Sequence, residues 1–535
     1  MSHPSPATPG AAASRHGAGV HAVLVASGIL LSRLFGLVRV RVFSHYLGQQ
    51  SDAADAFNAA FRIPNTLQNL FGEGAMSASF IPVYARLLAG GDEKEAARVA
   101  GAIAGLLALL VSLLIVGGVL ATPWLIDVIT PGFHGAKRDL AIRIVRTLFP
   151  GAGLLVLSAW CLGILNSHRR FFLSYAAPVI WNVAMIATLV AFGNRLGSSS
   201  LVVALAWGSV AGTLLQVVVQ LPTVLRVLGR LRLSLDTRSA RVRTVLRNFL
   251  PVLFSRGVVQ ISAYVDGMIA SLLPTGAMTG LANAQLLYIL PISVFGMSVS
   301  AAELPAMSSA LGDEAVIHAQ LRRRLDAGLQ QIAFFVVPTA VAFLALGDVV
   351  AGAILQTGRF TRGDTLYVWG ILVGPAIGLL AATLGRLYSS TYYALGDTRT
   401  PLRFAALRVS LAAALGYLTA VRLPPAIGLD TRWGVAGLTA SAAVAGWVEF
   451  ALLRSAMGRR IGRTGLAVGF VAKLWLAAVV AAGAAWAVKL VLATHNSPVL
   501  VGAAVLTPYA VCYFGLTILL GIPQATALMR RLRSK

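Results

Sequence analysis

The chain has 535 residues, of which 57% are hydrophobic and only 12% are charged, and its mean hydropathy is +0.78. A soluble domain cannot bury that much apolar surface, so the composition excludes an ordinary water-soluble protein and predicts an all-helical polytopic membrane protein. The net charge of +25 would suggest a nucleic-acid partner in a soluble protein. In a membrane protein the basic residues are instead expected to mark loops on one side of the bilayer.

Residues 1–18 form a leader of polar and small residues, which is predicted to be disordered and cytoplasmic. A membrane span needs about 20 apolar residues, and that requirement predicts about fourteen helices. Their expected ranges are 20–47, 55–88, 98–130, 139–166, 173–193, 200–228, 244–273, 280–311, 329–356, 365–394, 402–421, 433–456, 465–493 and 498–528.

Arginines are concentrated in alternate loops. Several lie between the sixth and seventh predicted spans, others between the twelfth and thirteenth, and the chain ends RRLRSK. The opposite loops carry almost no charge, so the distribution places both termini and the basic loops in the cytoplasm. A basic face of this kind can also hold anionic lipid head groups.

A weak internal repeat suggests two lobes. The second predicted span contains FGEGAMSASFIP (71–82) and the eighth contains FGMSVSAAELP (295–305), six spans apart. The predicted organisation is a six-helix lobe over 19–230, a second over 231–456, and two extra helices with a basic tail over 457–535. Such repeats place the substrate between the lobes and predict alternating access.

The second predicted span carries a continuous polar stripe. Its members, within DAFNAAFRIPNTLQNLFGEG, are Asp55, Asn58, Arg62, Asn65, Asn69 and Glu73. At 100° per residue they fall within an arc of roughly 80°, opposite an apolar face that includes Phe57 and Leu67. Lipid does not accept such a stripe, so it is predicted to line a water-filled cavity, or alternatively to form a polar seam between helices. Pro64 is expected to bend this helix at its middle.

The first predicted span contains SRLFGLVRVR, with Arg33, Arg39 and Arg41 around Gly36. Arg33 is expected about 20 Å into the span, too deep to reach the cytoplasmic surface. Arg39 and Arg41 could extend to the outer interface instead. Deep guanidinium groups pair bidentately with phosphate, so these arginines suggest an anionic, phosphorylated substrate.

The seventh predicted span places Arg256 near mid-depth, with Gln260 and Tyr264 on the same face and Asp266 beyond. Asp266 is interpreted either as a counter-ion to an arginine or as a ligand of a coupling cation such as Na⁺. Such a cation needs several oxygen ligands, and this stretch of sequence provides only one acidic residue. The histidines show no metal spacing, and the sequence carries no nucleotide or hydrolase motif. We therefore expect a transporter without a cofactor, driven by Na⁺, H⁺ or the membrane potential, and not an enzyme.

Several of these stretches resemble the MurJ (MviN) family of lipid II flippases. They are SRLFGLVR, DAFNAAFRIPNTLQNLFGEGAMSASFIPVYA, YILPISVFG and the DTRTP that follows the tenth span. The resemblance implies an inner-membrane protein of fourteen helices, with two lobes around a cationic cavity. It also implies export of the lipid-linked peptidoglycan precursor, and a groove for the lipid tail at the last two helices.

The resemblance assigns roles to particular residues. Arg33 and Arg39 match the family's arginines in the first helix, and Asp55, Asn65 and Glu73 match its second-helix motif. The expected binding residues for the diphosphate lipid are Arg33, Arg39, Arg62, Asn65, Gln68 and Arg256. Asp55 and Glu73 are expected to act as counter-ions, and Gly36 and Pro64 as gating positions.

The chain also departs from the family pattern. Val40 stands where an Asp usually follows the second arginine, Gln68 where an Arg is usual, and Gln285 and Leu286 where an Asp-Arg pair is usual. The leading hypothesis is a flippase for lipid II. Its rivals are an exporter of another polyprenyl-linked glycan or amphiphile, and a transport-dead scaffold that recruits cell-wall enzymes.

Overall fold

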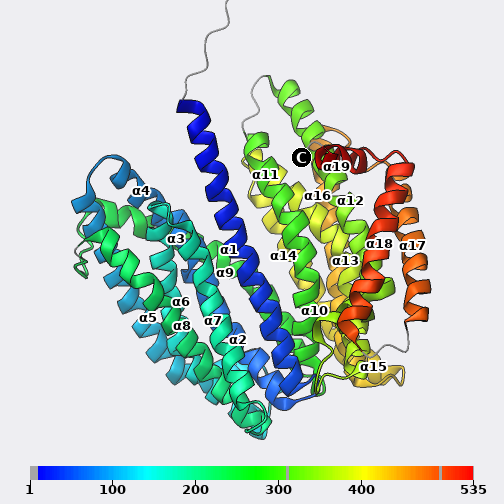
Figure 1. Cartoon of the computed structure of the whole chain (residues 1–535), viewed down its shortest axis with the longest axis horizontal. Helices are drawn as coiled ribbons and strands as arrows, with labels where there is room; N and C mark the ends of the chain where they lie inside the picture. The colour runs from blue at the N-terminus through cyan, green and yellow to red at the C-terminus, as the bar shows by residue number, and fades with distance from the viewer. Residues whose placement is uncertain (1–9, 230, 309–312, 493–496, 534–535) are drawn as a thin grey trace, which may run out of the picture. The chain divides into compact units, whose positions relative to one another are not determined.

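The computed structural model describes residues 10–229, 231–308, 313–492 and 497–533, and for some of these, Glu73 and Arg256 among them, only the backbone. The regular secondary structure of the described residues is helical, apart from one isolated bridge between Thr357 and Phe360 (Figure 1). The chain divides into two compact units, Met1–Leu47 with Ser51–Tyr264, and Gly48–Gln50 with Val265–Lys535. The expected all-helical class is thus confirmed.

The first unit is organised around one buried helix. Its elements are α1 (Gly10–Leu47), α2 (Asp52–Phe71), α3 (Glu73–Ser79), α4 (Ile81–Ala89), α5 (Glu93–Ile129), α6 (Gly135–Ser167), α7 (Phe171–Phe192), α8 (Ser198–Leu228) and α9 (Ala240–Ser271), which continues into the second unit. The central helix is α6, which packs against α2, α5 and α8 (Figure 1). The outer face of α7 carries α1, and Gly28 allows the close approach because a Cβ there would lie 2.8 Å from the Cβ of Tyr175.

The second unit has two buried helices at its centre, α12 (Glu314–Leu355) and α13 (Arg362–Ala394). Its other elements are α10 (Ala277–Pro291), η1 (Ile292–Met297), α11 (Ser298–Ser308), α14 (Arg399–Tyr417), η2 (Leu418–Arg422), α15 (Leu423–Ala426), η3 (Thr431–Trp433), α16 (Gly434–Ile461), α17 (Val468–Val491), α18 (Pro498–Leu519) and α19 (Pro523–Arg533). Helices α10, α12 and α16 surround α13, and α14 covers α16. The last two long helices, α17 and α18, pack on each other and on α12.

Every predicted span falls on a helix or a series of helices, and eleven of them are long and apolar enough to cross a membrane among the residues described. The remaining three predicted spans correspond to α1, α2–α4 and α9. These three carry all of the predicted site residues. Their polar side chains need protein or water neighbours, because hydrocarbon does not solvate them.

The second predicted span is not one continuous helix, so this prediction is wrong. The range 55–88 is divided into α2, α3 and α4, and the first break falls at Gly72, where a Cβ would lie 2.1 Å from the Gln68 carbonyl oxygen. α2 runs through Pro64 as one helix, so the bend expected there does not interrupt it. The second Phe-Gly step of the predicted repeat, at Gly296, lies inside the π-helical turn η1. Both Phe-Gly steps therefore mark an interruption of regular α-helix.

The boundary between the compact units falls within α9, whereas the repeat and the arginine-rich loop suggested a lobe boundary at 230/231. The sequence-based boundary stays a prediction. The loop itself is extended and lies in the first unit. We call residues 231–239 the linker strap.

The linker strap lies on two glycines of α5. Ideal Cβ atoms at Gly101 and Gly105 would come within 2.2 Å of the Arg232 carbonyl oxygen and 2.4 Å of the Ser234 carbonyl oxygen. Arg98 of α5 donates to the Asp236 carboxylate at 2.8 Å. The spacing Gly-x-x-x-Gly commonly lets two membrane helices touch, and here it admits an extended backbone instead.

We expect Gly101→Ala to release the linker strap, because the new methyl group would occupy the position of the Arg232 carbonyl. Limited trypsin digestion should then cleave after the strap arginines on the order of tenfold faster, since cleavage follows the population of the open form. Gly117→Ala on the same helix is the control, because its Cβ meets nothing within 4 Å. Equal cleavage rates in the two variants would show that the glycines do not hold the strap.

Acid should also loosen the linker strap. The pKa of Asp236 is lowered by the backbone N–H of Arg238 and by the side chain of Arg98, which both favour the charged carboxylate. The stabilisation is therefore present above the unfolded pKa, about 3.9, and is lost as the pH falls through the lower folded value. Amide hydrogen exchange of the strap, corrected for intrinsic rates, should show protection that disappears below about pH 4. In Asp236→Asn the protection should be weaker and independent of pH.

Candidate functional site

Arg39 of α1 lies beside two stacked aromatic rings of the first unit. Its guanidinium carbon lies 5.2 Å from the ring centroid of Phe61 and 5.5 Å from that of Trp181, and Nη1 donates to the Met185 sulfur at 3.7 Å. In the part of the chain that the structure describes, no carboxylate pairs with it. The side chain thus turns into the unit, which argues against the alternative in which Arg39 reaches for the outer interface.

The rings around Arg39 form a continuous column. Phe57 and Phe61 of α2 stack at 5.2 Å, Phe61 stacks on Trp181 of α7 at 5.6 Å, and Phe43 of α1 lies 5.4 Å from Phe57. Sequence reasoning missed Phe61, Trp181 and Met185. The only signal was the aromatic content of the two helices, which does not reveal that they meet.

Asp55 is buried at the start of α2 and has a lysine counter-ion. Its Oδ2 accepts from Lys137 Nζ at 2.8 Å, and the same ammonium lies 2.9 Å from Asp52 Oδ1. The Asp55 side chain is 2% exposed and Lys137 is 14% exposed, whereas Asp52 is 60% exposed. Lys137 opens α6, with its ammonium 4.6 Å from the Phe133 ring centroid. Nothing in the sequence around Lys137, which precedes an apolar run, indicates that it pairs with a residue of another helix.

Arg62 and Thr66 connect the polar stripe of α2 to α9. Arg62 Nη1 donates to the Ala263 carbonyl oxygen at 3.0 Å, and the Tyr264 hydroxyl donates to Thr66 Oγ1 at 2.8 Å. Thr66 in turn donates to the Arg62 carbonyl oxygen. These bonds all lie within the first unit. The predicted α2 stripe and the predicted face of the seventh span are therefore brought together at Tyr264.

The remaining predicted residues take up varied positions. Asn65 and Gln68 are half-buried on α2, and Arg33 is exposed on α1, which packs on α7. Gly36 is half-buried, and a Cβ there would meet nothing within 4 Å, so packing does not require glycine at that position. The side chains of Glu73 and Arg256 lie outside the described residues, and their predicted roles stay predictions.

Asp266 follows in α9, within the second unit, and is half-buried. Among the described residues no group of three or more His, Cys, Asp or Glu side chains is arranged to hold a metal ion. A coupling-cation site at Asp266 therefore stays a prediction that rests on this one carboxylate.

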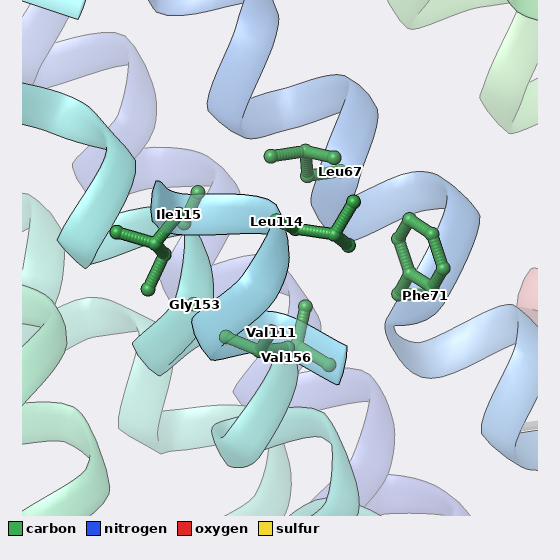
Figure 2. Close-up of a pocket in the computed structure, with 8 residues that line it drawn as sticks. Leu67, Phe71, Val111, Leu114, Ile115, Gly153 and Val156 are labelled. Atoms are coloured by element: carbon green, nitrogen blue, oxygen red, sulfur yellow. The ribbon is translucent and has the colours of Figure 1, made fainter. Parts of the chain in front are cut away.

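The apolar face of α2 packs on α5 and α6. Leu67 and Phe71 line a small closed space there with Val111, Leu114, Ile115, Ala152, Gly153 and Val156 (Figure 2). Its volume of about 10 Å³ is at the lower limit for a single water. This interior is packed core, so a ligand must use the opposite, polar side of α2.

The arrangement around Arg39 suits an anion. Aromatic rings attract the guanidinium through its charge but accept none of its N–H groups in strong hydrogen bonds, and the thioether of Met185 is a weak acceptor. A phosphate oxygen is a far better acceptor and pairs with the planar fork bidentately. The first unit therefore presents a cation whose position is fixed by aromatic contacts and whose acceptor can be exchanged.

Known proteins with similar sequences point to one family. The family model described as lipid II flippase MurJ matches residues 43–506. A probable lipid II flippase MurJ of Rhizobium meliloti (strain 1021) is 31% identical over 435 residues, covering 80% of this chain and 78% of the relative. The lipid II flippase MurJ of Burkholderia cenocepacia is 31% identical over 449 residues, covering 82% and 84%.

Solved structures support the same fold. A lipid II flippase MurJ in an inward closed conformation matches with a TM-score of 0.73 at 20% identity, covering 93% of this chain and 98% of that chain. An inward-facing multidrug resistance MATE family transporter of the MOP superfamily matches with a TM-score of 0.62 at 19% identity, covering 82% and 98%. The match to the family model extends over most of the chain and covers the larger part of each compact unit. The chain is thus a membrane protein that belongs to the lipid II flippase MurJ family.

Proposed function

We propose that this chain translocates lipid II, the undecaprenyl-diphosphate-linked peptidoglycan precursor, from the inner to the outer leaflet by alternating access. The observation that carries the proposal is the family match over residues 43–506, which includes the site residues of α2 and α9 and begins after Arg33 and Arg39 of α1. The relatives are named as lipid II flippases at about 30% identity over about four fifths of the chain.

In this proposal Arg39 is the principal contact to the diphosphate. Its guanidinium is oriented by Phe61 and Trp181, and exchange of the Met185 sulfur for a phosphate oxygen replaces a weak acceptor by a charged one. Arg33, Arg62 and Arg256 supply further positive charge, and Asn65 and Gln68 bind the polar head group. Asp55 acts through Lys137, by holding the start of α6 against α2.

The proposed location is the bacterial cytoplasmic membrane, with both termini in the cytoplasm. The support for this orientation is the arginine bias of the alternate loops. The inside-negative potential would then return an emptied cationic site inward, with about 2.3 kcal/mol available per charge per 100 mV. Na⁺ or H⁺ is the alternative coupling ion, and Asp266 is its proposed ligand.

A second candidate keeps the fold and changes the cargo to another polyprenyl-linked glycan or amphiphile. It is favoured by the four departures at Val40, Gln68, Gln285 and Leu286, which remove expected charges from the first, second and eighth spans. A transport-dead scaffold that recruits cell-wall enzymes is a third candidate, supported by the same missing charges. The contacts of Arg39 with Phe61 and Trp181 favour transport, because a scaffold has no need of an oriented guanidinium there.

The decisive experiment is complementation of a bacterium depleted of its lipid II flippase, with this chain expressed at matched levels. Growth and lipid II translocation support the proposal. If the cells lyse although the chain is present in the membrane, purified lipid II should be compared with an O-antigen-type polyprenyl lipid for binding. Preference for the latter indicates the second candidate, and binding to neither with retained cell-wall enzymes in pull-downs indicates the scaffold.

A further inference from the structure

The second unit contains a polar pocket of about 470 Å³ away from the predicted transport residues. It is formed by the turn between α13 and α14, the first turns of α14 and the end of α16. Its lining is Leu395, Gly396, Asp397, Thr398, Arg399, Thr400, Arg403 and Arg460. Three of these eight residues are arginines and one is acidic. The size is within the range of small-molecule sites.

The acid of the pocket is fully used by the protein. Asp397 accepts from the backbone N–H groups of Arg399 and Thr400, from the Thr400 hydroxyl at 2.8 Å, and from Arg460 at 3.0 Å. These contacts lower the pKa of Asp397, so it is charged at neutral pH. Asp397 therefore shapes the turn and holds one arginine in place, and it has little capacity left to neutralise the others.

Two arginines of the pocket have no such partner. Arg399 and Arg403 are four residues apart, so they lie on one face of α14, and both are exposed. Neither guanidinium has an acceptor among the described residues, while that of Arg460 is shared between Asp397 and the Tyr392 ring. The N-terminus of a helix carries a partial positive charge, which repels the two guanidinium groups in the first turns of α14. A bound anion would offset this repulsion.

The position of the pocket indicates where such an anion comes from. Both helices that meet at the turn, α13 and the segment Arg399–Ala426, are apolar enough to cross a membrane. The turn therefore lies where the chain leaves the bilayer and enters it again. Beside and beyond Arg403 in sequence, α14 exposes Leu402 (56%) and Leu407 (47%) as contact surface for acyl chains. Basic pockets at this level between membrane helices are typical sites for anionic lipid head groups.

We propose that Arg399, Arg403 and Arg460 form a binding site for the phosphate of an anionic phospholipid, separate from the transport site. The arginines pair with the phosphodiester oxygens, and the acyl chains follow the exposed leucines of α14. The net charge of the pocket is positive even with Asp397 ionised, which matches a singly charged diester. The bound lipid would fix the α13–α14 turn against the end of α16.

The test uses the full chain purified in detergent and native mass spectrometry with phosphatidylglycerol or phosphatidylcholine as the probe. The wild type should retain phosphatidylglycerol and not phosphatidylcholine. The double variant Arg399→Gln with Arg403→Gln should weaken phosphatidylglycerol binding about 30-fold, at about 1 kcal/mol for each arginine. The matched control is Arg323→Gln with Arg459→Gln, which removes the same charge from exposed positions outside the pocket and should bind as the wild type does.

Three results would overturn the proposal. The first is equal binding by the pocket variant and the wild type, and the second is equal loss in the control variant, which would mean a diffuse charge effect. The third concerns the source of the phosphate. If millimolar inorganic phosphate raises the melting temperature of the wild type but not of the pocket variant, and phosphatidylglycerol does not, the site takes a soluble anion and the lipid assignment is wrong. Circular dichroism and melting temperature of both double variants establish that each is folded.

Discussion

Arg39→Met is expected to abolish most lipid II translocation while leaving the protein folded. Methionine keeps an unbranched apolar side chain beside Phe61 and Trp181, but it removes every side-chain N–H donor. Truncating one partner of a desolvated charge pair costs about 2–5 kcal/mol in binding, so translocation at limiting substrate should fall at least about 30-fold. The measurement is lipid II flipping in proteoliposomes, together with growth of flippase-depleted cells.

The control for Arg39 is Arg143→Met on α6, an exposed arginine with no ion pair among the described residues. It removes the same charge and should transport as the wild type does. Arg39→Lys separates charge from geometry, because an ammonium cannot pair bidentately or stack as a guanidinium does, and it should restore only part of the activity. Wild-type flipping by Arg39→Met would refute the binding role, whatever the effect on stability.

Lys137→Met should give the largest loss of stability among single changes at the described site. It leaves the Asp55 carboxylate, which is 2% exposed, without its lysine. Breaking a buried pair by removing one partner typically costs about 3–5 kcal/mol. Asp55→Asn should cost less, because Lys137 then keeps the exposed Asp52 as a partner at 2.9 Å. Unfolding in mild detergent, followed by differential scanning fluorimetry and denaturant titration, measures both.

The neighbouring residue offers a matched control. Arg138 pairs with Asp127 at 2.6 Å, but the two side chains are 31% and 52% exposed. Arg138→Met should therefore leave the stability nearly unchanged. The double variant Asp55→Asn with Lys137→Met should recover part of the loss, because no buried charge is left behind. Additive losses in the double variant would mean that the two residues stabilise the unit independently.

Much of the site could be assigned to helices from the sequence, because polar residues in apolar spans are rare and stand out. The stripe of α2 with its buried apolar side is one example, since Leu67 and Phe71 line the packed interior toward α5 and α6 (Figure 2). Periodicity could not reveal partners. Lys137 lies 82 residues after Asp55, and Trp181 lies 142 residues after Arg39, so only the packing of α6 and α7 on their neighbours brings these groups together.

Helix interruptions were the other weakness of sequence reasoning. Pro64 was expected to bend α2, and the helix runs through that residue without a break, so the bend stays a prediction. The interruption that the sequence did not predict falls at Gly72, whose conformation requires glycine because a Cβ there would collide with the Gln68 carbonyl oxygen. The Gly101 and Gly105 pair illustrates the same limit. A Gly-x-x-x-Gly spacing is compatible with a close helix contact, but the tertiary structure shows that the linker strap lies there.

The sequence by itself determined that this is a helical membrane protein, which helices bear charge, and which family it resembles. These properties follow from hydropathy and local periodicity, which act along the chain. The tertiary structure decided which rings contact Arg39, which cation neutralises Asp55, and where an arginine pocket opens beside α14. Such contacts join residues far apart in sequence, and their energies depend on burial and distance, which a linear pattern does not contain.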